Sequence, residues 1–113
     1  MIYIAAPYWH EDFEIRNIRF YHATRYAAQL AIQGELSYSP LTYGHGTVKE
    51  IGTLIPEEYW RRHGLKMLSL CDRMVVLTMK GWETSRGVAA ELELARQLSI
   101  PVQYINVDYL KEL

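Results

Sequence analysis

Apolar residues recur at helical spacing in one long stretch near the start of the chain. Between residues 13 and 33 they lie three or four positions apart, as on one face of a helix. Asp12 precedes the stretch where an N-cap residue belongs, and Gly34 follows it where a glycine commonly ends a helix. The pattern therefore predicts a helix over Phe13–Gln33.

Two shorter stretches also favour helices. Pro56 stands where the first helical residue is often proline, and two glutamates follow in the first turn, where the helix dipole favours acids. We expect this helix to run to about Cys71. Ser85 is a natural N-cap for a further helix over Gly87–Leu98.

Short apolar runs separate the helices and predict strands. They cover Ile2–Ala5, Leu36–Ser39, Met74–Thr78 and Val102–Ile105. Continuous apolar runs are typical of strands buried on both faces, and strands that alternate with helices form parallel sheets. We therefore expect an α/β fold: a Rossmann-like or flavodoxin-like three-layer sandwich with a mainly parallel sheet of four or five strands, in a single domain over residues 1–113.

The segments between these elements are predicted to be loops. Pro40–Gly52 contains three glycines, and a loop of this length in a small domain is usually functional. Lys80–Arg86 is a second loop, and Asp108–Leu113 is expected to form a terminal helical turn. Ligands of open parallel sheets bind at the carboxyl ends of the strands, so both loops belong to the expected site.

Composition excludes several classes of function. Twelve basic and 13 acidic residues give a net charge of −1, which provides no electrostatic reason to bind a nucleic acid polymer. The single cysteine, Cys71, excludes an internal disulfide and a cysteine-based zinc site. The histidines lack metal-ligand spacing, so we expect no metal and no other cofactor. Without a signal peptide or an apolar run that spans a bilayer, we expect a cytoplasmic protein with no membrane partner.

The segment from Ser85 to Glu91 carries the most specific signal of a site. Ser85 and Gly87 open a helix directly after a buried strand, where free N–H groups and the helix dipole attract anions. The alternative is an ordinary helix cap. Glu91 lies on the apolar face of this helix, whereas Glu93 points outward, where Arg96 can pair with it. Glu91 is therefore either a carboxylate used in the site or a boundary acid that reaches solvent.

Other candidates come from separate parts of the chain. Tyr3, in the first strand, either hydrogen-bonds a carboxylate in the site or is a core tyrosine. His45 stands between two glycines and is the most site-like histidine. Tyr43, Trp60 and Trp82 either stack on a heteroaromatic base or pack in the core or an interface.

These residues together resemble the nucleoside 2-deoxyribosyltransferase superfamily. The closest pattern is that of its 2′-deoxynucleoside 5′-monophosphate N-glycosidases and their short uncharacterised relatives. The matching residues are Tyr3-Ile4-Ala5-Ala6-Pro7, Asp72 before an apolar strand, Gly81-Trp82-Glu83, and Ser85-x-Gly87-Val88-x-x-Glu91-Leu92-x-x-Ala95.

The resemblance implies roles for the candidates. Glu91 would be the nucleophile that attacks the anomeric carbon and forms a covalent glycosyl-enzyme, and Tyr3 would hydrogen-bond it. Ser85 would bind the 5′-phosphate of a nucleotide substrate. The other expected ligand-binding residues are Ala6, Pro7, His45, Trp82, Arg86 and Gly87.

One position departs from the family. An acid that assists the leaving base is expected at the position of Gly64. Either His63 replaces it, or Glu58, Asp12 or a carboxylate of a neighbouring subunit reaches in, or activity is weak or absent. The family also implies a homodimer or higher homo-oligomer. The alternative function is a non-catalytic nucleotide-binding domain, a sensor or carrier, in which Glu91 is structural.

Overall fold

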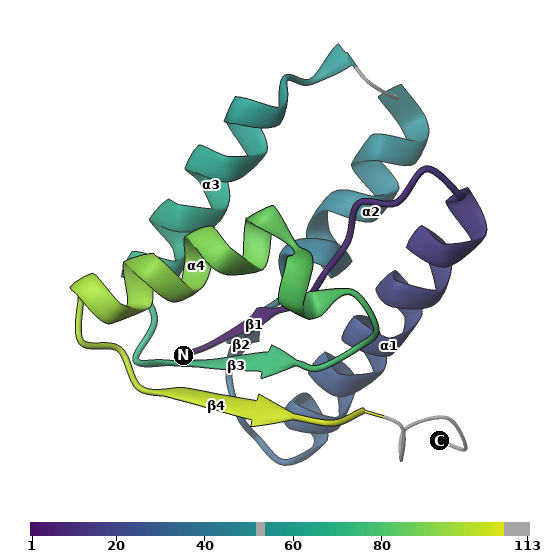
Figure 1. Ribbon diagram of the computed structural model, residues 1–113. Coiled ribbons are helices and arrows are strands. Elements are labelled where there is room, and N and C mark those ends of the chain that lie inside the picture. The colour runs from purple at the N-terminus through teal and green to yellow at the C-terminus, as the bar shows by residue number, and fades with distance from the viewer. Residues whose placement is uncertain (52–53, 108–113) are drawn as a thin grey trace.

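The computed structural model describes residues 1–51 and 54–107, and it has the expected α/β fold (Figure 1). Helices alternate with strands along most of the chain. The elements are β1 (Ile2–Ala5), α1 (Phe13–Ile32), β2 (Ser37–Tyr38), α2 (Pro40–Ile51), α3 (Glu57–Ser69), β3 (Arg73–Leu77), the short 3-10 helix η2 (Trp82–Thr84), α4 (Arg86–Gln97) and β4 (Val102–Ile105). The helical turn expected over Asp108–Leu113 lies outside the described residues.

The sheet formed by the described strands is entirely parallel. Its four strands lie in the order β2-β1-β3-β4. The chain moves from β1 to β2 on one side and places β3 on the other side of β1, so the winding direction reverses between β1 and β3. In open parallel sheets such a reversal leaves a crevice at the carboxyl ends of the two strands.

Helices cover both faces of the sheet, which confirms the three-layer arrangement (Figure 1). Successive strand residues point to opposite faces, so β1 contributes to two cores. Ile2 and Ile4 pack in a core with α1, which includes Leu30. Tyr3 and Ala5 face the other way, into a core with α3 and α4. Tyr3, with its polar hydroxyl, is completely buried in that second core.

The ends of α1 follow the sequence signals. The Asp12 side chain accepts a hydrogen bond from the backbone N–H of Glu14 (2.9 Å), and Gly34 after the helix has a φ of +82°. The start of α3 differs slightly from the prediction. Pro56 has an extended backbone and precedes the helix, which begins at Glu57.

The predicted loop over Pro40–Gly52 is wrong, because residues 40–51 form α2. Pro40 is its first residue, and the Ser39 hydroxyl accepts the backbone N–H three positions later (3.2 Å), as a helix cap does. Gly44 lies in the helix interior against Trp60 of α3, and a Cβ there would be 3.6 Å from its ring. A glycine that suggests a loop in the sequence therefore lies inside a helix, where a Cβ would make only an ordinary contact.

Candidate active site

A cavity of about 920 Å³ opens at the carboxyl ends of β1 and β3. Its walls come from the segment after β1, from α2 and α3, and from the start of α4. The volume suits a small organic ligand. The expected catalytic residues Tyr3, His63 and Glu91 line it, as do the expected ligand-binding residues Ala6, Pro7, His45, Ser85, Arg86 and Gly87.

Tyr3 and Glu91 form the centre of the cavity floor. The Tyr3 hydroxyl donates a hydrogen bond to Glu91 Oε2. Burial and the neighbouring Glu91 carboxylate raise the pKa of Tyr3, so its hydroxyl keeps its proton and remains a donor. Burial also raises the pKa of Glu91 to about 7, although the Tyr3 hydrogen bond acts in the opposite direction. Glu91 Oε1 makes no hydrogen bond with any described residue, so this oxygen is available to a ligand.

Glu93 shows what the same side chain does on the outer face of α4. It accepts hydrogen bonds from Arg96 (2.6 Å) and Gln97 (3.1 Å) and lies exposed to solvent. The hydrogen bond from Arg96 lowers the pKa of Glu93 to about 2. The opposite placement of Glu91 and Glu93 that helical spacing predicts is therefore confirmed.

The N-terminus of α4 forms the other part of the floor. Ser85 caps the helix, because its Oγ accepts the backbone N–H of Val88 (3.2 Å). Its hydroxyl proton remains available to donate. Gly87 is open, since a Cβ there would meet only Ser85 Oγ at 3.9 Å. We call Tyr3, Ser85, Gly87 and Glu91 the polar floor.

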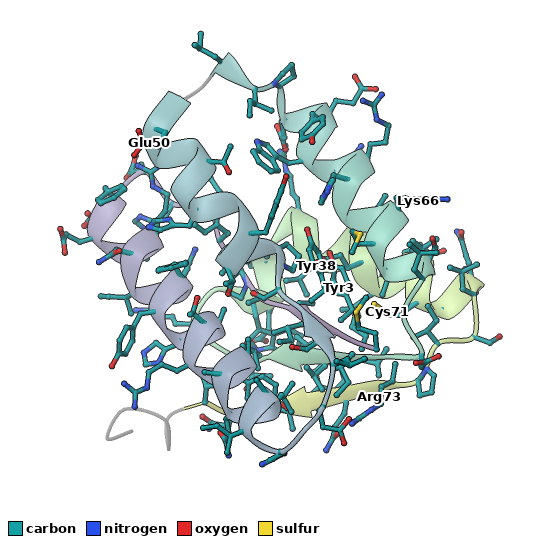
Figure 2. All side chains as sticks on the ribbon, turned by 180° about the vertical axis from the view of Figure 1, so that it is seen from behind. Tyr3, Tyr38, Glu50, Lys66, Cys71 and Arg73 are labelled. Atoms are coloured by element: carbon teal, nitrogen blue, oxygen red, sulfur yellow. The ribbon has the colours of Figure 1, made fainter. Side chains whose placement is uncertain are left out.

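Four rings contact one another, and we call them the aromatic cluster: Tyr38, Tyr43, Trp60 and His63. Tyr38, Trp60 and His63 line the cavity, whereas Tyr43 is not among the lining residues. Tyr43 stacks on His63 with ring centroids 5.0 Å apart and an interplanar angle of 8°, and its edge meets Trp60. Tyr38 connects the cluster to the floor, because its ring lies 5.8 Å from that of Tyr3 (Figure 2). The sequence indicates Tyr43 and Trp60 only as separate candidates, and it gives no indication of Tyr38.

The limited space at Gly64 explains why the chain has no acid at this position. A Cβ at Gly64 would lie 3.1 Å from the Tyr3 hydroxyl, so any side chain there would press on the partner of Glu91. Two of the alternative acids do not line the cavity: Glu58 is exposed, and Asp12 caps α1. His63 does line it, and so does Glu57, which the sequence did not single out.

Arg19 is a further lining residue that sequence reasoning missed. It donates hydrogen bonds to the backbone oxygens of Trp9 (2.9 Å) and Lys80 (3.0 Å), and so joins the segments that follow β1 and β3. Burial lowers the pKa of Arg19. Gly81 has a φ of +97°, and a Cβ there would lie only 2.6 Å from Arg19 Nη2. No sequence signal connects Arg19 to a glycine 62 positions away.

Two predicted ligand-binding residues have packing roles. His45 lies on α2, not on a loop, and is buried with its ring stacked on Phe20 (4.4 Å) and its Nδ1 hydrogen-bonded to the Tyr8 hydroxyl (2.6 Å). It still forms part of the cavity lining. Trp82 is not among the lining residues. It packs against Tyr104 and the core beneath α4, as the packing alternative expects.

Within residues 1–51 and 54–107, no group of three or more His, Cys, Asp or Glu side chains is placed to hold a metal ion. No helix in these ranges is long and apolar enough to cross a membrane.

Comparison with known protein families gives a match over nearly the whole chain. No curated protein matches the chain. A family described as "Domain of unknown function (DUF1937)" matches residues 1–107, which include every residue of the polar floor and the aromatic cluster. The chain therefore belongs to the DUF1937 family.

Proposed function

We propose that this protein cleaves the N-glycosidic bond of a nucleoside 5′-monophosphate or 2′-deoxynucleoside 5′-monophosphate, through a covalent glycosyl–Glu91 intermediate. The observation that carries the proposal is the Tyr3–Glu91 pair in the cavity. A glutamate whose pKa is about 7 and whose second oxygen lacks a partner among the described residues suits a nucleophile better than a structural acid.

The position of Ser85 supports a phosphorylated ligand. Ser85 and Glu91 are six residues apart, which is roughly 9 Å along a helix axis. A nucleotide whose phosphate meets the N-terminus of α4 would place its sugar toward Glu91. The Ser85 hydroxyl and the free N–H groups of the first turn donate to phosphate oxygens, and Arg86 adds positive charge at the cavity. The resemblance to nucleoside 2-deoxyribosyltransferases points to the same chemistry.

The reaction proceeds in two displacements. Glu91 Oε1 attacks the anomeric carbon, the bond from that carbon to the base nitrogen breaks, and its electron pair leaves with the base. A water molecule then attacks the anomeric carbon and breaks its bond to Glu91. One water proton is released and the other stays in the new sugar hydroxyl. In a transferase a second base replaces the water. Two inversions give net retention.

A nucleotide-binding module without turnover is the second candidate. Gly64 favours it, because the family that this chain resembles has an acid here that assists the leaving base, and a side chain at this position would crowd the Tyr3 hydroxyl. In that case Glu91 would hold the sugar by hydrogen bonds.

Incubation with 2′-deoxynucleoside 5′-monophosphates and the matching nucleosides tests the proposal, with chromatography to detect free base. We expect base release from monophosphates and much slower release from nucleosides. Ser85→Asp should remove this preference because its carboxylate repels phosphate, whereas the neutral cap in Ser85→Asn should retain most of it. Calorimetric binding of monophosphates without base release would favour the non-catalytic module, and no binding at all would refute both.

A further inference from the structure

The His63 imidazole is held by a hydrogen bond and by neighbouring aromatic rings. The Tyr38 hydroxyl and His63 Nδ1 lie 3.1 Å apart, within hydrogen-bond distance. Three tyrosine rings, those of Tyr38, Tyr43 and Tyr59, pack around the imidazole. The imidazole is therefore held by both a polar and a stacking contact while it lines the cavity.

The hydrogen bond determines which nitrogen of neutral His63 carries the proton. Tyr38 is partly buried, and its hydroxyl makes no other hydrogen bond with a described residue. If Nδ1–H donated to Tyr38, the hydroxyl proton would lack a protein acceptor. Burial raises the pKa of Tyr38 to about 12, so the hydroxyl is protonated, and donation to Nδ1 would give its proton an acceptor. The proton of the neutral imidazole then lies on Nε2.

The tyrosine–histidine pair lies next to the nucleophile. Gly64, the residue after His63, approaches the Tyr3 hydroxyl so closely that a Cβ would be 3.1 Å from it. The ring of Tyr38 also lies beside that of Tyr3. Tyr38 and His63 line the same cavity as Glu91, so both are placed to meet a base attached to a sugar carbon there.

We infer that Tyr38 and His63 form the subsite for the leaving base, in which Tyr38 is a positioning residue and His63 Nε2–H donates to a ring nitrogen or carbonyl oxygen of the base. The inference rests on the proposed function. When the bond to the anomeric carbon breaks, its electron pair stays on the base, and the Nε2–H hydrogen bond stabilises the developing negative charge. His63 keeps its proton, and water supplies the proton that the departing base takes up.

The tautomer is tested first, by ¹⁵N NMR of the neutral imidazole. We expect His63 to show the Nε2–H pattern in the native protein and a mixture of both tautomers in Tyr38→Phe. Tyr43→Phe is the matched control, because it keeps the stacked ring and removes a hydroxyl that does not bond His63. An Nδ1–H pattern in the native protein would overturn the inference.

The leaving group is tested second. With an ordinary nucleotide, His63→Ala should lower kcat about 100-fold, within the usual range for such contacts. With an N7-methylated guanine nucleotide, whose base departs neutral, it should change kcat less than about threefold, since no negative charge develops. Equal losses on both substrates would reject the inference and leave the proposed function intact.

A third measurement does not need turnover. Free adenine and hypoxanthine, titrated into the protein, should shift the His63 Nε2 resonance in the native protein and less in Tyr38→Phe. If no substrate releases base, the proposed enzyme activity fails, and this titration still decides whether the subsite exists. A His63 signal that neither base moves would overturn it.

Discussion

The polar floor lines the same cavity as three rings of the aromatic cluster, but the two regions are built from different kinds of interaction. In the floor, Tyr3 donates to Glu91, and Ser85 accepts from the first turn of α4. These bonds are directional and hold individual atoms in place. In the aromatic cluster, Tyr43 stacks on His63 and packs edge-on against Trp60. Ring contacts tolerate a wider range of geometry than hydrogen bonds.

The two kinds of interaction suit two different tasks, chemistry at the sugar and recognition of the base. Chemistry at a sugar carbon needs a carboxylate fixed to within a fraction of an ångström, because reacting groups must be aligned before the barrier is reached. Recognition of a flat base needs a fitting surface and a few donors. Substitutions in the floor should therefore change the rate with every base, whereas substitutions in the cluster should change the rate according to the base.

Glu91→Gln should have the largest effect, and Glu93→Gln is its matched control on the same helix. Removing the proposed nucleophile should lower kcat about a thousandfold or more with every base, because an amide oxygen does not form the glycosyl-enzyme. Glu93 contacts only Arg96 and Gln97, so its substitution should change kcat less than twofold. Steady-state kinetics and a thermal melt of both variants make the comparison. Similar losses in both variants would contradict the role of Glu91.

The parts of the fold that follow local rules could be predicted from the sequence. The strand over Val102–Ile105 has the predicted bounds, and Asp12 and Ser85 cap the helices as expected. Caps and short apolar strands depend on residues within a few positions of one another. The helix over Pro40–Ile51 could not be predicted in this way, because its glycines disfavour a helix locally, whereas its packing against α1 is a contact with a distant part of the chain.

The candidate site likewise combines features that local sequence patterns predict with contacts between distant residues that they do not. Helical periodicity alone separates Glu91 from Glu93, and a serine before a glycine marks the start of α4. The pairing of Tyr38 with His63 joins β2 to α3, and Arg19 joins two segments that the sheet brings together. Neither pair has a sequence spacing that a motif could reveal, so these contacts appear only when the chain is folded.

Gly81→Ala should have an intermediate effect, on stability, with Gly34→Ala as its control. Both glycines have positive φ, +97° and +82°, so alanine at either position should cost about 1 kcal/mol of unfolding free energy. Only Gly81 meets a neighbour, because its Cβ would lie 2.6 Å from Arg19 Nη2, whereas nothing lies within 4 Å of a Cβ at Gly34.

Displacing Arg19 would break its hydrogen bond to Lys80, so Gly81→Ala should lose about 2–3 kcal/mol in total. Urea denaturation measures both variants. Nucleotide binding should weaken only in Gly81→Ala, because Arg19 joins the segments that flank the polar floor. Equal destabilisation in the two variants would show that Arg19 moves aside without lowering the free energy of unfolding.

Tyr3→Phe should have the smallest effect, a shift of the pH profile. As the proposed nucleophile, Glu91 must be ionised to attack, and its pKa is about 7, so kcat/KM should rise with pH through about 7. The Tyr3 hydrogen bond stabilises the carboxylate and lowers the pKa of Glu91. Its loss should move the rising limb to higher pH by roughly one pH unit, as expected when a hydrogen bond to a charged group is removed. Tyr43→Phe, in the aromatic cluster, should leave the limb in place.

The same titration affects unfolding, which gives a readout independent of catalysis. Because the pKa of Glu91 is raised from 4.5 in the folded chain, its contribution to stability is complete below about pH 4.5 and is lost as pH rises through about 7. Tyr3→Phe should extend that loss to higher pH, and Glu91→Gln should abolish it. Urea denaturation at a series of pH values measures both variants. If neither the rate profile nor the stability profile of Tyr3→Phe moves, the hydroxyl does not lower the pKa of Glu91. The polar floor would then hold its groups no more precisely than the aromatic cluster does.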